Sequence, residues 1–317
     1  MNLSKRVFEI TEPELRYAKQ LGVNHIIGYL PKGDWGFLEF VQLRKFVESY
    51  ELNLSAIGSP PPSLMKEIMH ASNRRDESIG ELCIFIRDMG KAGIPVLAYT
   101  FNLLGQSWRW RAGLSGGGRG DAGVQSFDYD LVKDAPHSSL GEIAESEVWN
   151  RLEYFLERVA PVAEEAGVRL ACHPDDPPVP ALGGVARVQK SVSDLQRLIN
   201  IVPSPSNGLL FCVGTVAEMG EDVIDAAQRF IEQKKVFIIH FRNIKLLPGD
   251  SLRFDETSID EGDLDMVSLM RALHEMKYDG LIDPDHAPVH VGDSQWGRHR
   301  GFAYAIGYMK ALQQHMG

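Results

Sequence analysis

Residues 168–180 read VRLACHPDDPPVP, and the chain changes character in the middle of this stretch. The first half is an apolar run from Val168 to Cys172, which is typical of a strand buried in a parallel sheet that helices cover. The second half begins with His173, continues with two aspartates and contains too many prolines to extend a regular element. The sequence therefore predicts a buried strand that ends at His173 and carries ionisable side chains at its carboxyl end.

Short apolar runs of this kind recur along the chain, and segments with a helical period separate most of them. The eight runs are Arg6–Ile10, His25–Leu30, Leu54–Gly58, Pro95–Phe101, Val168–His173, Leu209–Val213, Val236–Phe241 and Gly280–Pro284. The predicted helices are Glu12–Leu21, Leu38–Ser49, Glu77–Lys91, Glu145–Ala166, Val192–Ile201, Asp222–Gln233, Met266–Met276 and Phe302–Gln314. Several of them stop at a glycine just before the next run, where a left-handed residue closes a helix.

Eight strand–helix units close most simply into a (β/α)8 TIM barrel, an α/β fold. We predict one such domain over residues 1–317. A doubly wound open sheet is the alternative, although no GxGxxG pattern follows an early strand.

Residues 102–145 interrupt this alternation with a segment that has no clear period. A loop of this length is often functional, and its place after a strand puts it on the active-site face of a barrel. We predict a lid over an anionic, hydroxylated ligand, to which Trp108, Arg109 and Arg119 contribute. A flexible surface insertion is the alternative for the loop, and core packing is the alternative for Trp108 and Trp110.

Composition narrows the class of protein. The 317 residues carry a formal net charge of -10, which argues against a nucleic-acid partner because phosphate binding needs a basic surface. Three widely spaced cysteines favour a reducing compartment over a disulfide framework. We see neither a secretory signal nor an apolar run long enough to cross a membrane. The expectation is a cytoplasmic enzyme or binding protein.

The carboxyl ends of four successive predicted strands carry groups that can bind a metal. They are His173, Cys212, His240 and either Asp283 or Asp285, between which alternation along the strand does not decide. Barrel enzymes build their sites at these ends. Two imidazoles, a thiolate and a carboxylate can bind a divalent cation, whereas a single buried histidine or cysteine is more often a core residue. Cys172 must face the other way from His173.

At these residues the chain resembles the mannonate dehydratase family, metal-dependent sugar-acid dehydratases built on xylose-isomerase-like barrels. The most specific stretch is Tyr154–Pro178, YFLERVAPVAEEAGVRLACHPDDPP. Weaker matches are LAYTFN (97–102), GLLFCVGT (208–215), IIHFRN (238–243) and PDH (284–286). The resemblance implies the ligands His173, Cys212, His240 and Asp285, with Mn²⁺ or Fe²⁺ as the metal. The ligand types alone would fit zinc equally well.

The family reaction implied by the resemblance removes water from D-mannonate and gives 2-dehydro-3-deoxy-D-gluconate. It makes the chain a hydro-lyase whose principal acid/base residue is His286. The family's proton-transferring tyrosine is absent, because Trp296 stands at its position and His299 at that of a second tyrosine. Since an indole cannot shuttle a proton, His290, His299 or Tyr304 takes over, or the reaction has changed.

Three further residues have expected roles near this site. Arg242 shares a strand face with His240 and is expected to hold a substrate carboxylate, the alternative being an ion pair with Asp175 or Asp176. Asn243 is expected to orient a substrate hydroxyl. Asp176 is expected to hold the ring N–H of a ligand histidine.

Other functions stay open at this point. A related metal-dependent isomerase or epimerase is one, although a cysteine ligand argues against it. A barrel that binds a sugar acid without turning it over is another, and a zinc hydrolase is a third. The expected partner is a small-molecule sugar acid, and a homo-oligomer is left open.

Overall fold

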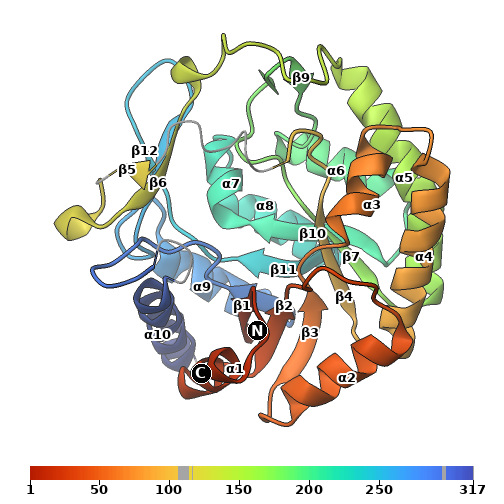
Figure 1. Cartoon of the computed structure of the whole chain (residues 1–317). Coiled ribbons are helices and arrows are strands. Elements are labelled where there is room, and N and C mark those ends of the chain that lie inside the picture. The colour runs from red at the N-terminus through yellow and green to blue at the C-terminus, as the bar shows by residue number, and fades with distance from the viewer. Residues whose placement is uncertain (106–113, 116, 295–297, 317) are drawn as a thin grey trace.

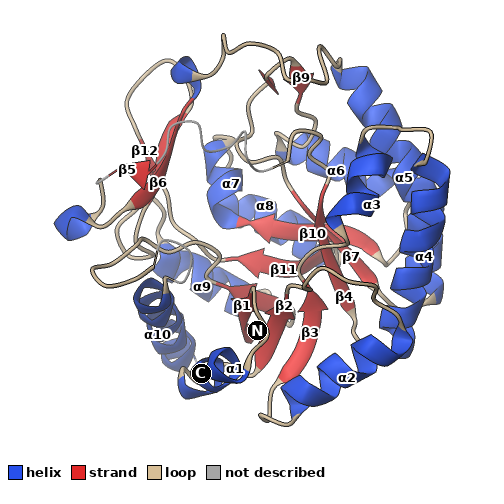
Figure 2. Ribbon diagram, viewed as in Figure 1, coloured by secondary structure: helices blue, strands red, loops and turns tan. Residues whose placement is uncertain are grey.

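The computed structural model describes residues 1–105, 114–115, 117–294 and 298–316. Eight parallel strands close into a barrel, and helices surround it (Figure 1 and Figure 2). The barrel strands are β1 (Asn2–Val7), β2 (His25–Gly28), β3 (Asn53–Ile57), β4 (Val96–Thr100), β7 (Arg169–His173), β10 (Asn207–Cys212), β11 (Val236–His240) and β14 (Leu281–Asp283). Each strand pairs with the next barrel strand along the chain, and β14 closes on β1. The predicted (β/α)8 barrel is confirmed.

The helices follow the predicted segments closely. They are α1 (Glu12–Gln20), α2 (Phe37–Glu48), α3 (Pro62–Met69), α4 (Arg75–Lys91), α5 (Glu145–Glu165), α6 (Val192–Ile201), α7 (Val213–Glu218), α8 (Val223–Glu232), α9 (Met266–Glu275) and α10 (His299–Met316). Side-chain caps fix several beginnings, as at Asp222, whose carboxylate accepts the amides of Ile224 and Asp225. The sequence missed α3 and α7, which are too short to show a clear period.

The first strand was predicted four residues too late. It spans Asn2–Val7, although polar residues interrupt its apolar pattern. Lys5 is buried in the wall, where its ammonium group reaches Glu14 at 3.1 Å. The hydroxyl of Ser4 donates to the carbonyl of Ile282. Because tertiary partners satisfy these polar groups, the strand tolerates a sequence that reads poorly as a core strand.

Two apolar layers hold the barrel. One fills the space between strands and helices, and the other fills the barrel interior. The interior layer includes Ala171, Leu210, Ile238 and Leu281. Since alternate residues of a strand share a face, the residues two positions further along also point inward. This periodicity directs four polar residues to the carboxyl end of the barrel, namely His173, Cys212, His240 and Asp283.

Part of the insertion between residues 102 and 145 forms a small antiparallel sheet rather than an isolated loop. The sheet has the order β12-β13-β6-β5. It joins β5 (Leu114–Ser115) and β6 (Val124–Asp128) to β12 (Lys245–Leu246) and β13 (Arg253–Glu256), which belong to the connection after β11. The sheet stands to one side of the barrel (Figure 2). The sequence did not predict this pairing, because β12 and β13 are short and mostly polar.

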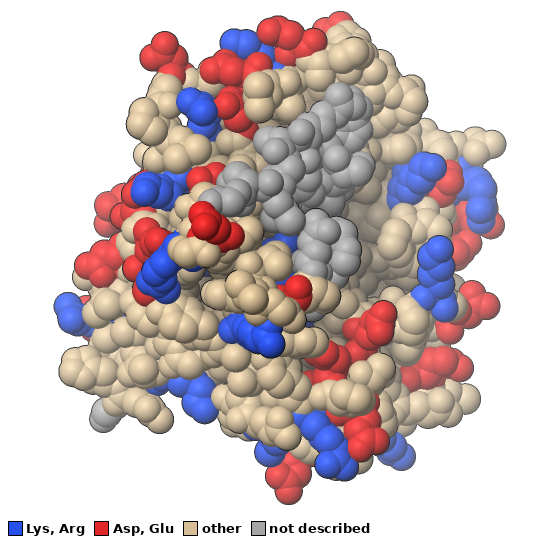
Figure 3. All heavy atoms as spheres, turned by 60° about the vertical axis from the view of Figure 1, so that its left-hand side comes forward, with Lys and Arg blue, Asp and Glu red and all other residues tan. Residues whose placement is uncertain are grey.

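The surface carries charged side chains of both signs (Figure 3). On the face shown in Figure 3, lysine and arginine side chains are interspersed with aspartate and glutamate. Within the described ranges, no helix combines the length and the apolar character needed to cross a membrane.

Candidate metal centre and active site

Three of the four predicted metal ligands meet at the carboxyl end of the barrel. Ligand atoms of His173, Cys212 and His240 all lie within 4.8 Å of one another. Strand register produces this convergence, because Cys212 of β10 is aligned with His240 of β11. Cys212 is fully buried, His240 is 4% exposed, and His173 faces the cavity described below.

Both histidines are prepared to act as neutral ligands. Nδ1 of His173 lies 2.7 Å from the carbonyl oxygen of Pro174, so this nitrogen donates its proton and leaves Nε2 with a lone pair. Burial lowers the pKa of His240 well below its ordinary value, which keeps the ring uncharged. A neutral imidazole is the form that binds a metal.

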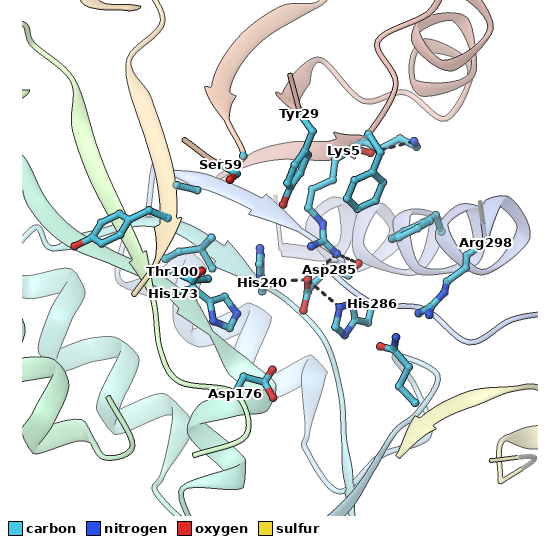
Figure 4. Close-up of a pocket in the computed structure, with 18 of the residues that line it drawn as sticks. Lys5, Tyr29, Ser59, Thr100, His173, Asp176, His240, Asp285, His286 and Arg298 are labelled. Carbon is cyan, nitrogen blue, oxygen red and sulfur yellow. Dashed lines mark hydrogen bonds and ion pairs between the residues drawn. The ribbon is translucent and has the colours of Figure 1, made fainter. Parts of the chain in front are cut away.

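Asp285, the fourth predicted ligand, lies beside this group but outside the common 4.8 Å limit. Its Oδ1 is 3.3 Å from Nδ1 of His240 and 2.6 Å from Nη2 of Arg6. Figure 4 shows the carboxylate between His240 and His286. Burial alone would raise the pKa of Asp285, but the nearby cations, Arg6 foremost, hold it well below its usual range.

The backbone of Asp285 is held in an unusual conformation. Its φ is 57°, in the left-handed region, which costs a residue with a side chain about 1–3 kcal/mol. The amide of Asp285 donates to Oδ1 of Asp283 at 2.6 Å, and Arg6 donates to the carbonyl of Asp285. These contacts fix the direction in which the Asp285 carboxylate points.

Arg242 is a buried hub rather than a cavity-lining group. Its side chain is 1% exposed, and its guanidinium contacts four carboxylates and a thiol. The contacts are Asp176 at 2.8 Å, Glu218 at 3.0 Å, Asp285 at 3.1 Å, Glu256 at 3.3 Å and Cys212 Sγ at 3.3 Å. The ion pair with Asp176, weighed from the sequence as the alternative, is thus present. Arg242 is not among the described residues that line the cavity, so the expected contact with a substrate carboxylate is not supported.

His286, the predicted acid/base residue, is oriented by a glutamate from the small sheet. Nδ1 of His286 contacts Oε2 of Glu256, a residue that is only 3% exposed. Nε2 of His286 lies 3.8 Å from Oδ1 of Asp285. The Gln125 amide supports the pair from β6 when its oxygen and nitrogen are assigned to satisfy their neighbours, which places the nitrogen 2.6 Å from Glu256 Oε2 and the oxygen 2.9 Å from Nη2 of Arg298.

The site opens into a cavity of about 780 Å³. Six of the predicted residues line it, namely His173, Asp176, His240, Asp285, His286 and His299. Asp176 bonds to Arg242 and to Thr215, so the contacts described for it differ from the expected one with a ligand histidine. His299 lies at the rim, where Nε2 is 2.6 Å from Glu14.

The structure does not support the predicted contacts of Asn243 and Arg119 with substrate. The Asn243 side chain donates to the carbonyls of Ile259 and Leu264 and accepts the amides of Ile244 and Leu264, so it secures the turn after β11. Arg119 is exposed and pairs with Asp260 at 3.0 Å. Among the described residues, neither lines the cavity. Trp108, Arg109 and Trp296 lie outside the described residues.

Only one of the three candidates for replacing the family tyrosine is among the described residues that line the cavity. His299 lines the cavity. Tyr304 donates its hydroxyl to Asp260 at 2.7 Å. Nδ1 of His290 lies 4.0 Å from Asp293. Neither Tyr304 nor His290 is among the described lining residues.

Three residues of this site were not predicted from the sequence. Arg6 and Tyr29 line the cavity, and Glu256 contacts His286. Arg6 and Tyr29 lie at the ends of β1 and β2, so the strand-end rule would have found both had it been applied to the first strands. Glu256 carried no signal, because only the tertiary pairing of β13 with β6 brings it to His286.

The fold and the site together define a (β/α)8-barrel protein with a candidate His–Cys–His metal centre at the carboxyl ends of its strands. The family model for "D-mannonate dehydratase (UxuA)" matches residues 1–140 and 137–317, and the chain belongs to this family. A mannonate dehydratase of Streptococcus uberis is 28% identical over 320 residues, which cover 92% of this chain and 91% of the relative.

Solved structures agree with the family assignment. The crystal structure of mannonate dehydratase from Streptococcus suis serotype 2 superposes with a TM-score of 0.85 at 27% identity, covering 99% of this chain and 94% of that one. A xylose isomerase domain protein from Planctomyces limnophilus matches with a TM-score of 0.61 at 14% identity, covering 100% of this chain and 97% of that one. This second likeness concerns the fold alone.

Proposed function

We propose that this chain is a metal-dependent hydro-lyase that converts D-mannonate into 2-dehydro-3-deoxy-D-gluconate and water. The observation that carries the proposal is the His173–Cys212–His240 cluster in a member of the D-mannonate dehydratase family, because both of its histidines line the same cavity as His286. The family name indicates the substrate, and the side chains of the cluster can bind a cation.

The residues of the cluster fit a divalent cation. Nδ1 of His240 is buried and makes no hydrogen bond among the described residues, although Oδ1 of Asp285 lies 3.3 Å away. Nearby, the guanidinium groups of Arg6 and Arg242 face five carboxylates, those of Asp176, Glu218, Glu256, Asp283 and Asp285. A buried excess of negative charge is unfavourable, and a cation beside Cys212 and Asp285 would reduce it. We propose Mn²⁺ or Fe²⁺, held by His173, Cys212, His240 and Asp285.

The difficult step is removal of the C2 proton, which is weakly acidic because it lies next to a carboxylate. A divalent cation bound at the cluster would stabilise the negative charge that develops there. His286 is placed to take the proton. With Nδ1–H directed at Glu256, the lone pair of the ring is on Nε2, which lies 3.8 Å from Oδ1 of Asp285.

The role of Arg242 follows from its contacts rather than from the substrate. Its Nε lies 3.1 Å from Oδ2 of Asp285 and 3.3 Å from Sγ of Cys212. We propose that Arg242 positions these two ligands and favours their charged forms, which are the forms that bind metal.

Incubation of the purified protein with D-mannonate and Mn²⁺ tests the proposed reaction. The expected product is a 2-keto-3-deoxy acid, formed with loss of one water per substrate and detected by mass spectrometry. Interconversion of sugar isomers at constant mass would instead support an isomerase or epimerase. A tightly bound but unaltered sugar acid would support a binding protein without turnover.

The Cys212→Ser variant is expected to bind metal at least about tenfold more weakly than wild type and to lose activity in proportion. Serine preserves the size of the side chain but removes the soft sulfur ligand. Elemental analysis of the purified proteins measures the metal content. Cys172→Ser is the matched control, because Cys172 points into the outer apolar layer and contacts Gln189. Equal metal content in the two variants would remove Cys212 from the ligand set.

The Glu256→Gln variant is expected to lose about 10–100-fold in kcat while retaining its metal, since an amide orients the His286 ring less firmly than a carboxylate. Glu218→Gln removes a carboxylate from the same Arg242 hub and serves as the comparison. Steady-state kinetics should show a smaller loss for Glu218→Gln. Similar losses in both variants would mean that Glu256 acts through Arg242 and not through His286.

A further inference from the structure

Loss of water from a sugar acid requires two proton transfers. One proton leaves C2, and the hydroxyl that departs from C3 must gain one to leave as water. His286 serves the first transfer in the function proposed above. A separate group in the same cavity that holds its proton at neutral pH would supply the second.

Tyr29 is a phenol at the carboxyl end of β2 that faces this cavity. Figure 4 shows its side chain directed at the region of Asp285 and His240. The charge of Arg6 acts on this phenol, and the same guanidinium lies 2.6 Å from Oδ1 of Asp285. Arg6 therefore interacts with both the phenol of Tyr29 and Asp285, a proposed metal ligand.

The ring of Tyr29 is held in place on two sides. Its centroid lies 4.7 Å from that of Phe8. On the other side it packs against Gly58, where a Cβ atom would come within 2.4 Å of the ring. Because any side chain at position 58 would collide with the ring, the close approach depends on glycine. A ring fixed in this way aims its hydroxyl with little freedom.

The electrostatic setting suits a proton donor. Burial raises the pKa of Tyr29, so the phenol keeps its proton at neutral pH, while Arg6 opposes this shift and stabilises the phenolate that forms on donation. Two other proton donors that line the cavity, Lys5 and His299, both contact Glu14. Tyr99 packs in the outer apolar layer.

We propose that Tyr29 is a second catalytic residue, which donates its proton to the C3 hydroxyl as that group leaves. The proposal rests on the proposed function. The C2–H bond breaks and its proton goes to Nε2 of His286, the C2=C3 bond forms, and the C3–O bond breaks with release of water. The enol then becomes the 2-keto acid by moving the proton of its C2 hydroxyl to C3. The proton on His286 returns to the Tyr29 phenolate through solvent.

The Tyr29→Phe variant tests this role, because it removes one oxygen atom and preserves the ring that packs on Phe8 and Gly58. With D-mannonate and Mn²⁺, kcat is expected to fall by about 10²–10⁴-fold, with metal content and melting temperature close to those of wild type. Tyr129→Phe is the control, since the Tyr129 hydroxyl bonds to the carbonyl of Ala181 away from the cavity.

A substrate whose leaving group needs no proton distinguishes proton donation by Tyr29 from a purely structural role of its side chain. Fluoride departs from 3-deoxy-3-fluoro-D-mannonate as an anion, so Tyr29→Phe should eliminate fluoride at a rate close to wild type. His286→Asn should lose both reactions. Equal losses on the hydroxy and fluoro substrates, or unchanged turnover of D-mannonate, would overturn the role of Tyr29 alone. A wild-type protein inactive on both substrates would overturn the proposed function and this role with it.

Discussion

The His286→Asn variant is expected to retain its metal and to lose about 10²–10⁴-fold in kcat, the usual contribution of a positioned acid or base. Asparagine fills a similar volume and can still contact Glu256, but its amide cannot exchange a proton at the position of Nε2. His286 lies next to the proposed ligand Asp285 in sequence, while its own Nδ1 is committed to Glu256. Metal binding and proton transfer are thus assigned to the adjacent residues Asp285 and His286. A substitution of His286 is therefore expected to affect proton transfer and leave metal binding intact.

Measurement of kcat, KM and metal content on the same preparations checks this prediction. His274→Asn on the exposed side of α9 is the control and should leave all three quantities unchanged. Substantial activity in His286→Asn would assign the C2 proton to another residue. Loss of metal together with activity would instead make His286 part of the metal centre.

The Arg242→Met variant is expected to lower the free energy of unfolding by about 3–5 kcal/mol, because it leaves buried carboxylates without their cation. Methionine matches the aliphatic part of the side chain, so the loss reports charge rather than volume. Asp176, Glu218 and Glu256 are each almost fully buried and would face one another across the vacated guanidinium. This is the largest stability effect that the structure predicts.

Urea denaturation of metal-free protein measures this loss, and Arg119→Met supplies the comparison. Arg119 also pairs with a carboxylate, Asp260, but its side chain is 54% exposed. An exposed pair contributes at most about 1 kcal/mol, so this variant should remain close to wild type. Equal destabilisation by the two substitutions would show that the Arg242 hub does not stabilise the fold.

The sequence predicted the barrel well because its physical signals are local. Apolar runs mark the strands, helical periods mark the covering helices, and glycines close several helices. Gly22, Gly93 and Gly167 indeed have φ between 68° and 77°. The exception is β1, where Ser4 and Lys5 are satisfied by distant partners that the sequence cannot show.

The site was partly predictable for the same reason. Strand ends at His173, Cys212 and His240 converge in any barrel of this topology, and the first of these faces away from its neighbour Cys172 as alternation requires. Side chains fixed by contacts between distant segments were not predictable. Arg242 was expected to meet substrate, yet four carboxylates from separate elements surround it, and Glu256 reaches His286 only through the small sheet.

Anomalous diffraction from crystals of the protein, recorded on either side of the manganese and iron absorption edges, tests whether His173, Cys212, His240 and Asp285 bind one divalent cation. We expect a single anomalous peak within coordination distance of the two imidazoles, the thiolate and the Asp285 carboxylate. A metal-loaded crystal with no peak among these four side chains, or with its peak elsewhere in the barrel, would contradict it.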